Sequence, residues 1–389
     1  MKRSEGRILT SHVGSLPRPI ELIDMNKARF EGGAVDEATF NRTLAQSVAG
    51  VVRSQREAGI DVVNDGEFGK ASRSTIDYGP WQSYAYERLG GWERGPVTTA
   101  NPLAQRRERQ LFPGAYNEIT MSNAPAVAVG PALFTGPIIY VGKDAVDRDL
   151  ANLKAGLANS GAEEAFVTSV APGSFARRLN RYYKSDEEFL FALGEAMREE
   201  YSAIVGAGFV LQLDDPGLPD SWDMFNPEPP LAEYKRYARS TIEALNNALR
   251  GLPQDRVRYH ICWGSWHGPH TTDLPLKDIV DLMLEVQAGC YSVEAGNVRH
   301  EHEWKVWQDT KLPDGKLLMP GVVSHATNVV EHPEVVADRI VRYAKVVGRE
   351  NVIAGTDCGL GGRIHSEIAW AKLRSLAEGA RLASRQLWG

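Results

Sequence analysis

Eight short apolar runs, rich in β-branched residues, recur along the chain between amphipathic stretches. This alternation is typical of a parallel sheet, because each strand needs a crossover before the next parallel strand can pair. Eight such units in 389 residues predict one (β/α)8 barrel that carries insertions. We expect strands at residues 7–13, 61–64, 164–169, 209–214, 257–262, 290–294, 317–323 and 351–356.

The segments between these runs carry helix signals. Phe40, Leu44 and Val48 repeat at intervals of four residues, and Gly59 follows as a stop signal. Ser185 and Glu188 form a capping box before another apolar repeat. The remaining crossovers are expected at residues 144–158, 234–249, 276–287, 333–347 and 366–386.

Residues 71–141 interrupt this rhythm with many aromatic residues, glycines and prolines. They contain a strand-like pair at residues 126–129 and 137–141. Because this segment follows the second strand, we expect an insertion over the carboxyl-end mouth, where barrel enzymes place their active sites. With no internal repeat or low-complexity linker, residues 1–389 are expected to form a single barrel domain.

Composition excludes several classes of protein. Hydrophobic residues make up 43% and charged residues 24%, which is ordinary for a globular protein. The net charge of −6 and the lack of a basic stripe argue against a nucleic-acid partner. The charged first residues predict neither a signal peptide nor a transmembrane span, so we expect a cytoplasmic protein with no membrane partner.

Polar residues gather where the predicted strands end. Because the carboxyl ends of barrel strands meet at one mouth, these side chains are candidates for an active site. Six belong to the fourth to eighth units, and the other two to the first two units. They are His12, Glu67, Asp214, His260, Cys262, Glu294, His325 and Cys358.

His260 and Cys262 are alternate residues of one predicted strand, so both side chains can face one metal ion while Ile261 points to the outer layer. A packed histidine beside an inert cysteine is the alternative. Cys358 lies in a glycine-rich turn that can present a thiolate. Two thiolates and an imidazole suit Zn²⁺, and Glu294 can supply a fourth, oxygen ligand.

Two further residues have competing interpretations. The alternative for Glu294 is a salt bridge at the barrel rim with Arg299 or Arg363. Cys290 begins rather than ends its strand, so we interpret it as a small buried apolar residue. An odd number of cysteines, three, offers little basis for a disulfide framework.

Taken together, His260-x-Cys262, Glu294 and Asp357-Cys358-Gly359-Leu360 resemble the zinc ligands of cobalamin-independent methionine synthase, in order and in strand position. The resemblance covers most of the chain and extends to the single-barrel branch that includes epoxyalkane:coenzyme M transferase. Other matching segments are Gly14-Ser15-Leu16-Pro17-Arg18, Gly66-Glu67, Gln212-Leu213-Asp214-Asp215-Pro216, and His325 with Asn328.

The resemblance implies roles for these residues. Glu67 and Asp214 would hold an ammonium group on the thiol substrate, and the backbone of Ser15 would meet its carboxylate. Arg18 and Arg363 would instead suit a sulfonate thiol. His325 would donate a proton to the leaving group.

The implied activity is zinc-dependent S-alkyl, most simply S-methyl, transfer, with the substrate thiol activated as a zinc-bound thiolate. Addition of the thiol to an epoxide is the alternative. Because 389 residues accommodate one barrel, we expect no second barrel to help hold a polyglutamated folate, which leaves the alkyl donor open. The partners are then a small-molecule thiol and an alkyl donor.

Two rivals come from other classes. One is a barrel hydrolase in which Asp214, Glu67 or Glu294 acts as acid or base. The other is a non-catalytic thiol- or corrinoid-binding module that keeps zinc for structure. Structural zinc sites usually draw on short local ligand spacings, whereas these ligands come from three strand ends. The pattern therefore favours a catalytic metal.

Overall fold

The computed structural model describes residues 1–96, 106–118, 131–175 and 179–389. Eight strands form one sheet in the order β1-β11-β10-β9-β8-β7-β5-β2, and all their paired neighbours are parallel. This confirms the predicted (β/α)8 barrel. The strands are β1 (Leu9–Thr10), β2 (Val62–Val63), β5 (Glu164–Val170), β7 (Val210–Asp214), β8 (Val257–His260), β9 (Cys290–Glu294), β10 (Leu317–Val323) and β11 (Ile353–Thr356).

The barrel is completed where β1 meets β2. The backbone N–H of Asp61 donates to the carbonyl oxygen of Thr10 over 3.1 Å. In return, the backbone N–H of Thr10 donates to the Asp61 carboxylate over 3.0 Å. A side chain thus replaces a ladder carbonyl here, and β1 is much shorter than the predicted strand at residues 7–13.

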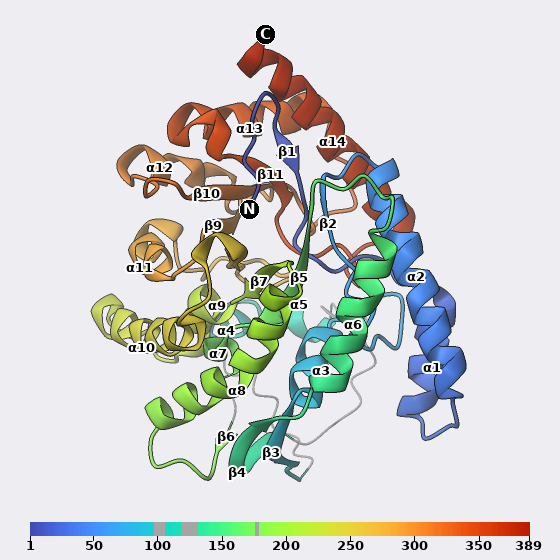
Figure 1. The fold of residues 1–389 in the computed structure, drawn as a ribbon. Coiled ribbons are helices and arrows are strands. Elements are labelled where there is room, and N and C mark those ends of the chain that lie inside the picture. The colour runs from blue at the N-terminus through green and yellow to red at the C-terminus, as the bar shows by residue number, and fades with distance from the viewer. Residues whose placement is uncertain (97–105, 119–130, 176–178) are drawn as a thin grey trace.

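Helices surround the strands, as Figure 1 shows. The predicted N-cap at Ser185 is present, because its side chain accepts from Glu188 N. The Asp36 side chain likewise accepts from Thr39 N at the start of α2. The crossover helices are α1 (Ile20–Phe30), α2 (Glu37–Glu57), α6 (Lys143–Gly156), α8 (Asp186–Gly206), α10 (Leu231–Leu249), α11 (Val280–Glu285), α12 (Val306–Asp309), α13 (Pro333–Val347) and α14 (Ser366–Trp388).

Shorter helices occupy the loops. The α-helical ones are α3 (Pro80–Glu87), α4 (Arg107–Leu111), α5 (Pro113–Glu118), α7 (Pro172–Phe175) and α9 (Gly217–Met224). The 3-10 turns are η2 (Gln254–Arg256), η3 (Leu276–Asp278), η4 (Glu301–Lys305) and η5 (Arg349–Asn351). Among the described residues, no helix combines the length and the apolar character that crossing a membrane requires.

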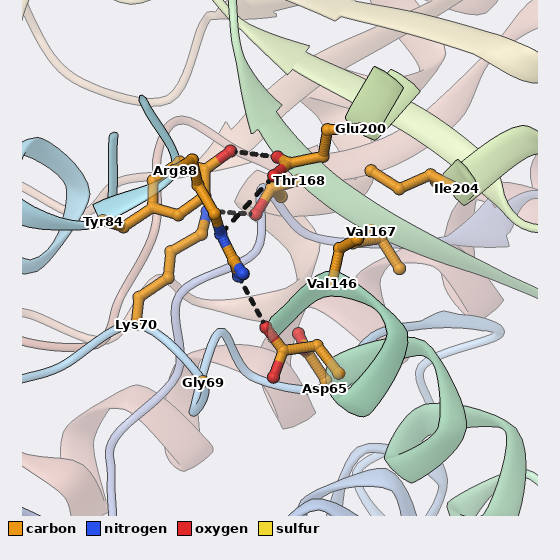
Figure 2. Close-up of a pocket in the computed structure, with 11 residues that line it drawn as sticks. Asp65, Gly69, Lys70, Tyr84, Arg88, Val146, Val167, Thr168, Glu200 and Ile204 are labelled. Carbon is orange, nitrogen blue, oxygen red and sulfur yellow. Dashed lines mark hydrogen bonds and ion pairs between the residues drawn. The ribbon is translucent and has the colours of Figure 1, made fainter. Parts of the chain in front are cut away.

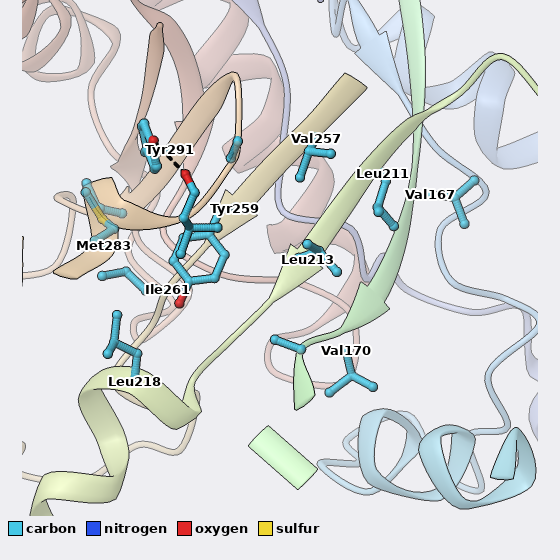
Figure 3. Packing of buried hydrophobic residues seen from close by; sticks show 14 of the residues in the cluster. Val167, Val170, Leu211, Leu213, Leu218, Val257, Tyr259, Ile261, Met283 and Tyr291 are labelled. Atoms are coloured by element: carbon cyan, nitrogen blue, oxygen red, sulfur yellow. Dashed lines mark hydrogen bonds between the residues drawn. The ribbon is translucent and has the colours of Figure 1, made fainter. Parts of the chain in front are cut away.

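The largest apolar core lies between the strands and the helices. Figure 3 shows Tyr259 and Ile261 packed beside Met283 in this layer, so Ile261 points away from the barrel axis, as expected. The barrel interior is more polar. Arg258 is buried there, donating to Gln212 Oε1 over 2.7 Å and lying 3.9 Å from the ring centroid of Phe166. Because side chains fill the barrel interior, we expect functional residues at the carboxyl ends of the strands.

The insertion after β2 adds a small sheet, in which β3 (Leu89–Arg94) pairs antiparallel with β4 (Ala132–Tyr140). Of the two strand-like segments expected there, residues 137–141 overlap β4, whereas residues 126–129 lie outside the described residues. The third strand, β6 (Leu179–Asn180), joins from the loop after β5 and was not predicted.

Part of the insertion contacts the loops at the carboxyl ends of the barrel strands. Arg106 forms a bidentate ion pair with Asp220 of α9, which follows β7, at 2.6 and 2.9 Å. The Glu108 carboxylate accepts from Thr271 N, after β8, over 2.6 Å. These contacts agree with an insertion over the barrel mouth; its bounds and the single-domain assignment stay predictions.

Candidate metal centre

Three predicted metal ligands lie together at the barrel mouth. One ligand atom from each of His260, Cys262 and Cys358 lies within 4.8 Å of the other two. His260 ends β8, Cys262 follows two residues later, and Cys358 follows the end of β11 by two residues. Strands far apart in the sequence therefore bring one imidazole and two thiols to one point.

The surroundings of His260 leave one ring nitrogen for a ligand. Its Nδ1 lies 3.0 Å from the hydroxyl of Ser292, the residue opposite it on β9. Its Nε2 is buried and has no hydrogen-bond partner among the described residues. A buried polar atom without a partner is costly, whereas metal-binding histidines commonly use their second nitrogen for an orienting hydrogen bond. The arrangement at His260 fits a metal ligand.

The spacing of the three atoms also suits zinc. With Zn–S near 2.3 Å and Zn–N near 2.0–2.1 Å, tetrahedral ligand atoms lie about 3.3–3.8 Å apart. An observed spread of at most 4.8 Å requires only small side-chain movements. The residues present therefore fit a zinc ion.

A hydrogen bond between the two thiols shifts their pKa values in opposite directions. This hydrogen bond from Cys262, together with contact from His260, holds the pKa of Cys358 well below its ordinary value. The same hydrogen bond, with burial, raises the pKa of Cys262 well above the ordinary value. Cys358 is therefore the more acidic thiol of the pair.

Glu294, the fourth predicted ligand, lies in a neighbouring group with His325 and Asp357, whose ligand atoms are also within 4.8 Å of one another. Its carboxylate accepts from Trp263 N over 3.0 Å and from Asn297 Nδ2 over 2.6 Å. Burial raises the pKa of Glu294 well above its ordinary value, and the charge of Cys358 adds to this rise. The two groups are thus adjacent, and ligation by Glu294 stays a prediction.

The two arginines considered as salt-bridge partners of Glu294 make other contacts. Arg299 donates to the carbonyl oxygen of Thr271 over 3.0 Å. Arg363 donates to Ser265 Oγ over 2.7 Å and lies over the ring of Tyr78. In the described part of the chain, no ion pair joins either arginine to Glu294. The carboxylate is therefore held by neutral donors.

Asp357 connects the end of β11 to the end of β9. One carboxylate oxygen accepts from the backbone N–H groups of Ala295 and Gly296, each over 2.7 Å. The other accepts from Asn297 over 3.1 Å. Burial raises the pKa of Asp357 to about 6, and these hydrogen bonds oppose that rise. Asp357 thus holds the Cys358 turn against the Glu294 loop, a role that the sequence motif did not reveal.

Gly321 of β10 makes this arrangement possible. A Cβ at this position would lie 2.4 Å from Asp357 Cα and 2.5 Å from its backbone nitrogen. We expect Gly321→Ala to lower the free energy of unfolding by about 1–3 kcal/mol and to reduce metal retention, because backbone next to Cys358 must shift. Urea unfolding and metal analysis measure both effects.

Gly50, inside α2, provides the matched control, because a Cβ there meets no atom of the described residues within 4 Å. Gly50→Ala should raise the free energy of unfolding by about 0.4–1 kcal/mol by restricting the unfolded chain. Equal stability changes in the two variants would contradict the role assigned to Gly321.

His325, the predicted proton donor, is 2% exposed, and neither ring nitrogen has a hydrogen-bond partner in the described structure. Burial lowers its pKa to about 4, although the nearby charge of Cys358 acts in the opposite direction. The ring is therefore neutral at rest. It lies beside both candidate ligand groups, where a buried imidazole with two unused nitrogens can exchange a proton with a reactant.

The predicted substrate-binding carboxylates also lie close to this centre. Burial raises the pKa of Asp214 to about 7; the charge of His260 lowers it, and that of Glu67 raises it. Glu67 adopts a left-handed backbone with φ of 61°, held by a hydrogen bond from its N–H to Asp65 Oδ1 over 2.9 Å. The structure therefore brings Glu67, Asp214 and His260 into one neighbourhood.

Ser15 and Arg18 lie on the loop after β1. The carbonyl oxygen of Ser15 accepts from the N–H groups of Leu360 and Gly361, each over 2.9 Å, so this loop packs on the Cys358 turn. Arg18 donates to the carbonyl oxygens of Glu67 and Lys70 over 2.8 and 3.2 Å. Arg18 therefore positions the Glu67 loop, and substrate binding by Arg18 or Ser15 stays a prediction.

Other histidines of the mouth have different environments. His300 is 3% exposed, stacks on Trp263 with ring centroids 4.0 Å apart, and lies between Asp273 and Glu303. These carboxylates raise its pKa to about 10 despite burial. His300 is therefore a buried residue that supports Trp263, whose backbone N–H donates to Glu294.

Known proteins resemble this chain over almost its whole length, although no family model matches it. It is 25% identical to the methionine synthase of Thermococcus kodakarensis, covering 97% of this chain and 94% of that protein. It is 24% identical to the 2-hydroxypropyl-CoM lyase of Xanthobacter autotrophicus, covering 98% and 96%. The resemblance to the methionine synthase family is confirmed.

A solved structure shares the fold of this methionine synthase-like chain. The B12-independent methionine synthase from Shewanella sp. W3-18-1, in complex with selenomethionine, matches with a TM-score of 0.72. Sequence identity is 19%, and the match covers 98% of this chain and 99% of that one. At this identity the match supports the barrel rather than the substrates.

Proposed function

We propose that this chain is a zinc-dependent S-alkyltransferase that transfers an alkyl group, most simply methyl, to the sulfur of a small-molecule thiol. The observation that carries the proposal is the convergence of Cys262, Cys358 and the unpartnered Nε2 of buried His260 at the barrel mouth. Glu294 is the fourth ligand in this proposal. The relatives named methionine synthase support the choice of methyl transfer.

When bound, zinc supplies the Lewis acidity that favours loss of a thiol proton near neutral pH. The protein residues do the rest. Glu67, Asp214 and the Ser15 loop orient the acceptor, and the buried mouth excludes water. The sulfur forms a bond to the alkyl carbon as the carbon–leaving-group bond breaks. His325 takes up the proton that the thiol loses and passes it to the leaving atom.

Addition of the thiol to an epoxide is a second candidate, favoured by the similarity to 2-hydroxypropyl-CoM lyase over 98% of this chain. The same residues would act in this reaction. The thiol sulfur forms a bond to an epoxide carbon, the carbon–oxygen bond of the epoxide breaks, and His325 protonates the released oxygen. The two functions thus differ in the donor and share the thiol site.

Zinc removal tests the proposal. We expect that protein stripped by a chelator forms no thioether from any thiol and donor, and that adding about one equivalent of zinc restores activity. Mass spectrometry of the products, with methyl donors and epoxides run in parallel, identifies the reaction. The hydroxyl analogue of each thiol serves as the control, because it lacks the soft sulfur.

Thioether formation by the stripped protein at the rate of the zinc-loaded protein would overturn the metal assignment. Hydrolysis of a donor without thiol consumption would instead favour the hydrolase alternative.

A further inference from the structure

A buried lysine lies against Glu67, and the mechanism above makes no use of it. The Nζ of Lys70 lies 3.5 Å from Glu67 Oε1, and the two side chains are 7% and 6% exposed. Lys70 also donates to the Thr168 hydroxyl over 2.6 Å, and this hydroxyl donates to the same Oε1 over 2.8 Å. One oxygen of Glu67 is thus engaged from within the protein.

Figure 2 shows Lys70 beside Thr168 and Tyr84 in a small enclosed pocket. Its ammonium lies 4.4 Å from the ring centroid of Tyr84, which favours a charged nitrogen. Two other buried anions of this pocket pair with a different cation, because Arg88 lies 2.8 Å from Asp149 and 3.4 Å from Glu200. Buried Asp65 also lines the pocket, and the charge of Lys70 opposes the rise in pKa that burial causes there. Among the described residues, the ion-pair partner of Lys70 is Glu67.

Contacts around Glu67 hold its carboxylate in place beside Lys70. A Cβ on Gly14 would lie 2.6 Å from Glu67 Oε1, so the carboxylate rests directly against the backbone of the β1 loop. The left-handed backbone of Glu67 is fixed by Asp65 and Arg18. Asp214 is also near enough to Lys70 and Glu67 to feel both charges.

We propose that Lys70 determines acceptor specificity: it neutralises Glu67 from within the chain, so the preferred thiol carries no ammonium group. An incoming ammonium that approached Glu67 would meet the like charge of Lys70 at short range. The acceptor class is a thiol with a neutral or acidic tail. This inference rests on the proposed thiol-transfer function.

The test compares homocysteine with 4-mercaptobutanoate, which differs from it only by the missing ammonium. Dissociation constants for cobalt-substituted protein are measured from the visible absorption that follows thiol binding. Because the ammonium also makes the thiol of homocysteine more acidic, the decisive quantity is the change in the ratio of the two constants between variants. Thiol acidity cancels in that comparison.

We expect Lys70→Met to shift the ratio by about tenfold or more toward homocysteine, while Lys70→Arg, which keeps the charge, leaves it within about twofold. Lys143→Met is the matched control, since it removes the same charge from an exposed lysine, 76% exposed and paired with Asp147. It should leave the ratio unchanged.

An unchanged ratio in Lys70→Met would overturn the inference and leave thiol transfer standing. The wild-type protein offers a second test that needs no variant to fold. One unit of thiol pKa accounts for a roughly tenfold difference in dissociation constant. If the wild-type protein binds homocysteine more tightly than 4-mercaptobutanoate by well over this factor, the inference is overturned. If neither thiol alters the cobalt spectrum, the proposed function fails and this inference with it.

Discussion

Replacing Cys262 or Cys358 by serine is expected to remove most of the bound zinc and to lower activity by two orders of magnitude or more. A serine hydroxyl is a poor ligand for zinc at neutral pH, and losing one of two thiolates leaves an incomplete ligand set. Metal analysis after exhaustive dialysis and a thioether-formation assay measure the two effects. The wild-type protein should retain about one zinc per chain.

Cys290 is the matched control for these variants. It is fully buried in a small apolar cluster and its thiol is far from neutral-pH ionisation, because burial raises its pKa to about 12. Cys290→Ala should keep its zinc and its activity, with only a moderate loss of stability from the small cavity. Full zinc occupancy and full activity in both serine variants would contradict the ligand assignment.

The second large effect is expected for His325→Ala: turnover falls by roughly 10²–10⁴ while zinc and thiol binding persist, as for the loss of a general acid. His325 lies beside the metal ligands but is placed on the leaving-group side in our mechanism. A sulfonium donor, whose leaving group needs no proton, should be much less affected. Single-turnover rates with the two donor types measure this difference.

His302 offers a control, because it is an exposed histidine of the same region. His302→Ala should retain wild-type rates with both donors. Equal rate losses with both donors in His325→Ala would mean that His325 orders the loop after β10 without transferring a proton. Loss of zinc would place His325 among the metal ligands, and the ligand set would then change.

Much of the barrel could be predicted, because buried parallel strands leave a local trace in the sequence. Runs such as residues 290–294 and 317–323 coincide with β9 and β10. The first strand could not be bounded in this way. Next to it the Asp61 carboxylate accepts from the N–H of Thr10 in place of a backbone carbonyl, and only the folded chain shows that contact.

The candidate site was partly visible for the same reason. His260 and Cys262 share a strand period, and Cys358 lies in a glycine-rich turn at another strand end, so their meeting followed from the barrel itself. The roles of Lys70 and Asp357 could not be predicted, because they depend on how loops from different strands pack. The spacing of Lys70, three residues after Glu67, was the one available signal.

X-ray absorption at the zinc edge, recorded with and without thiol, tests the central claim most directly. The account predicts two sulfur ligands and the rest nitrogen or oxygen in the resting protein, with a third sulfur at about 2.3 Å once thiol is added. A metal shell that lacks the two cysteine sulfurs, or that stays unchanged at saturating concentrations of thiols with neutral, acidic and ammonium-bearing tails, would contradict it.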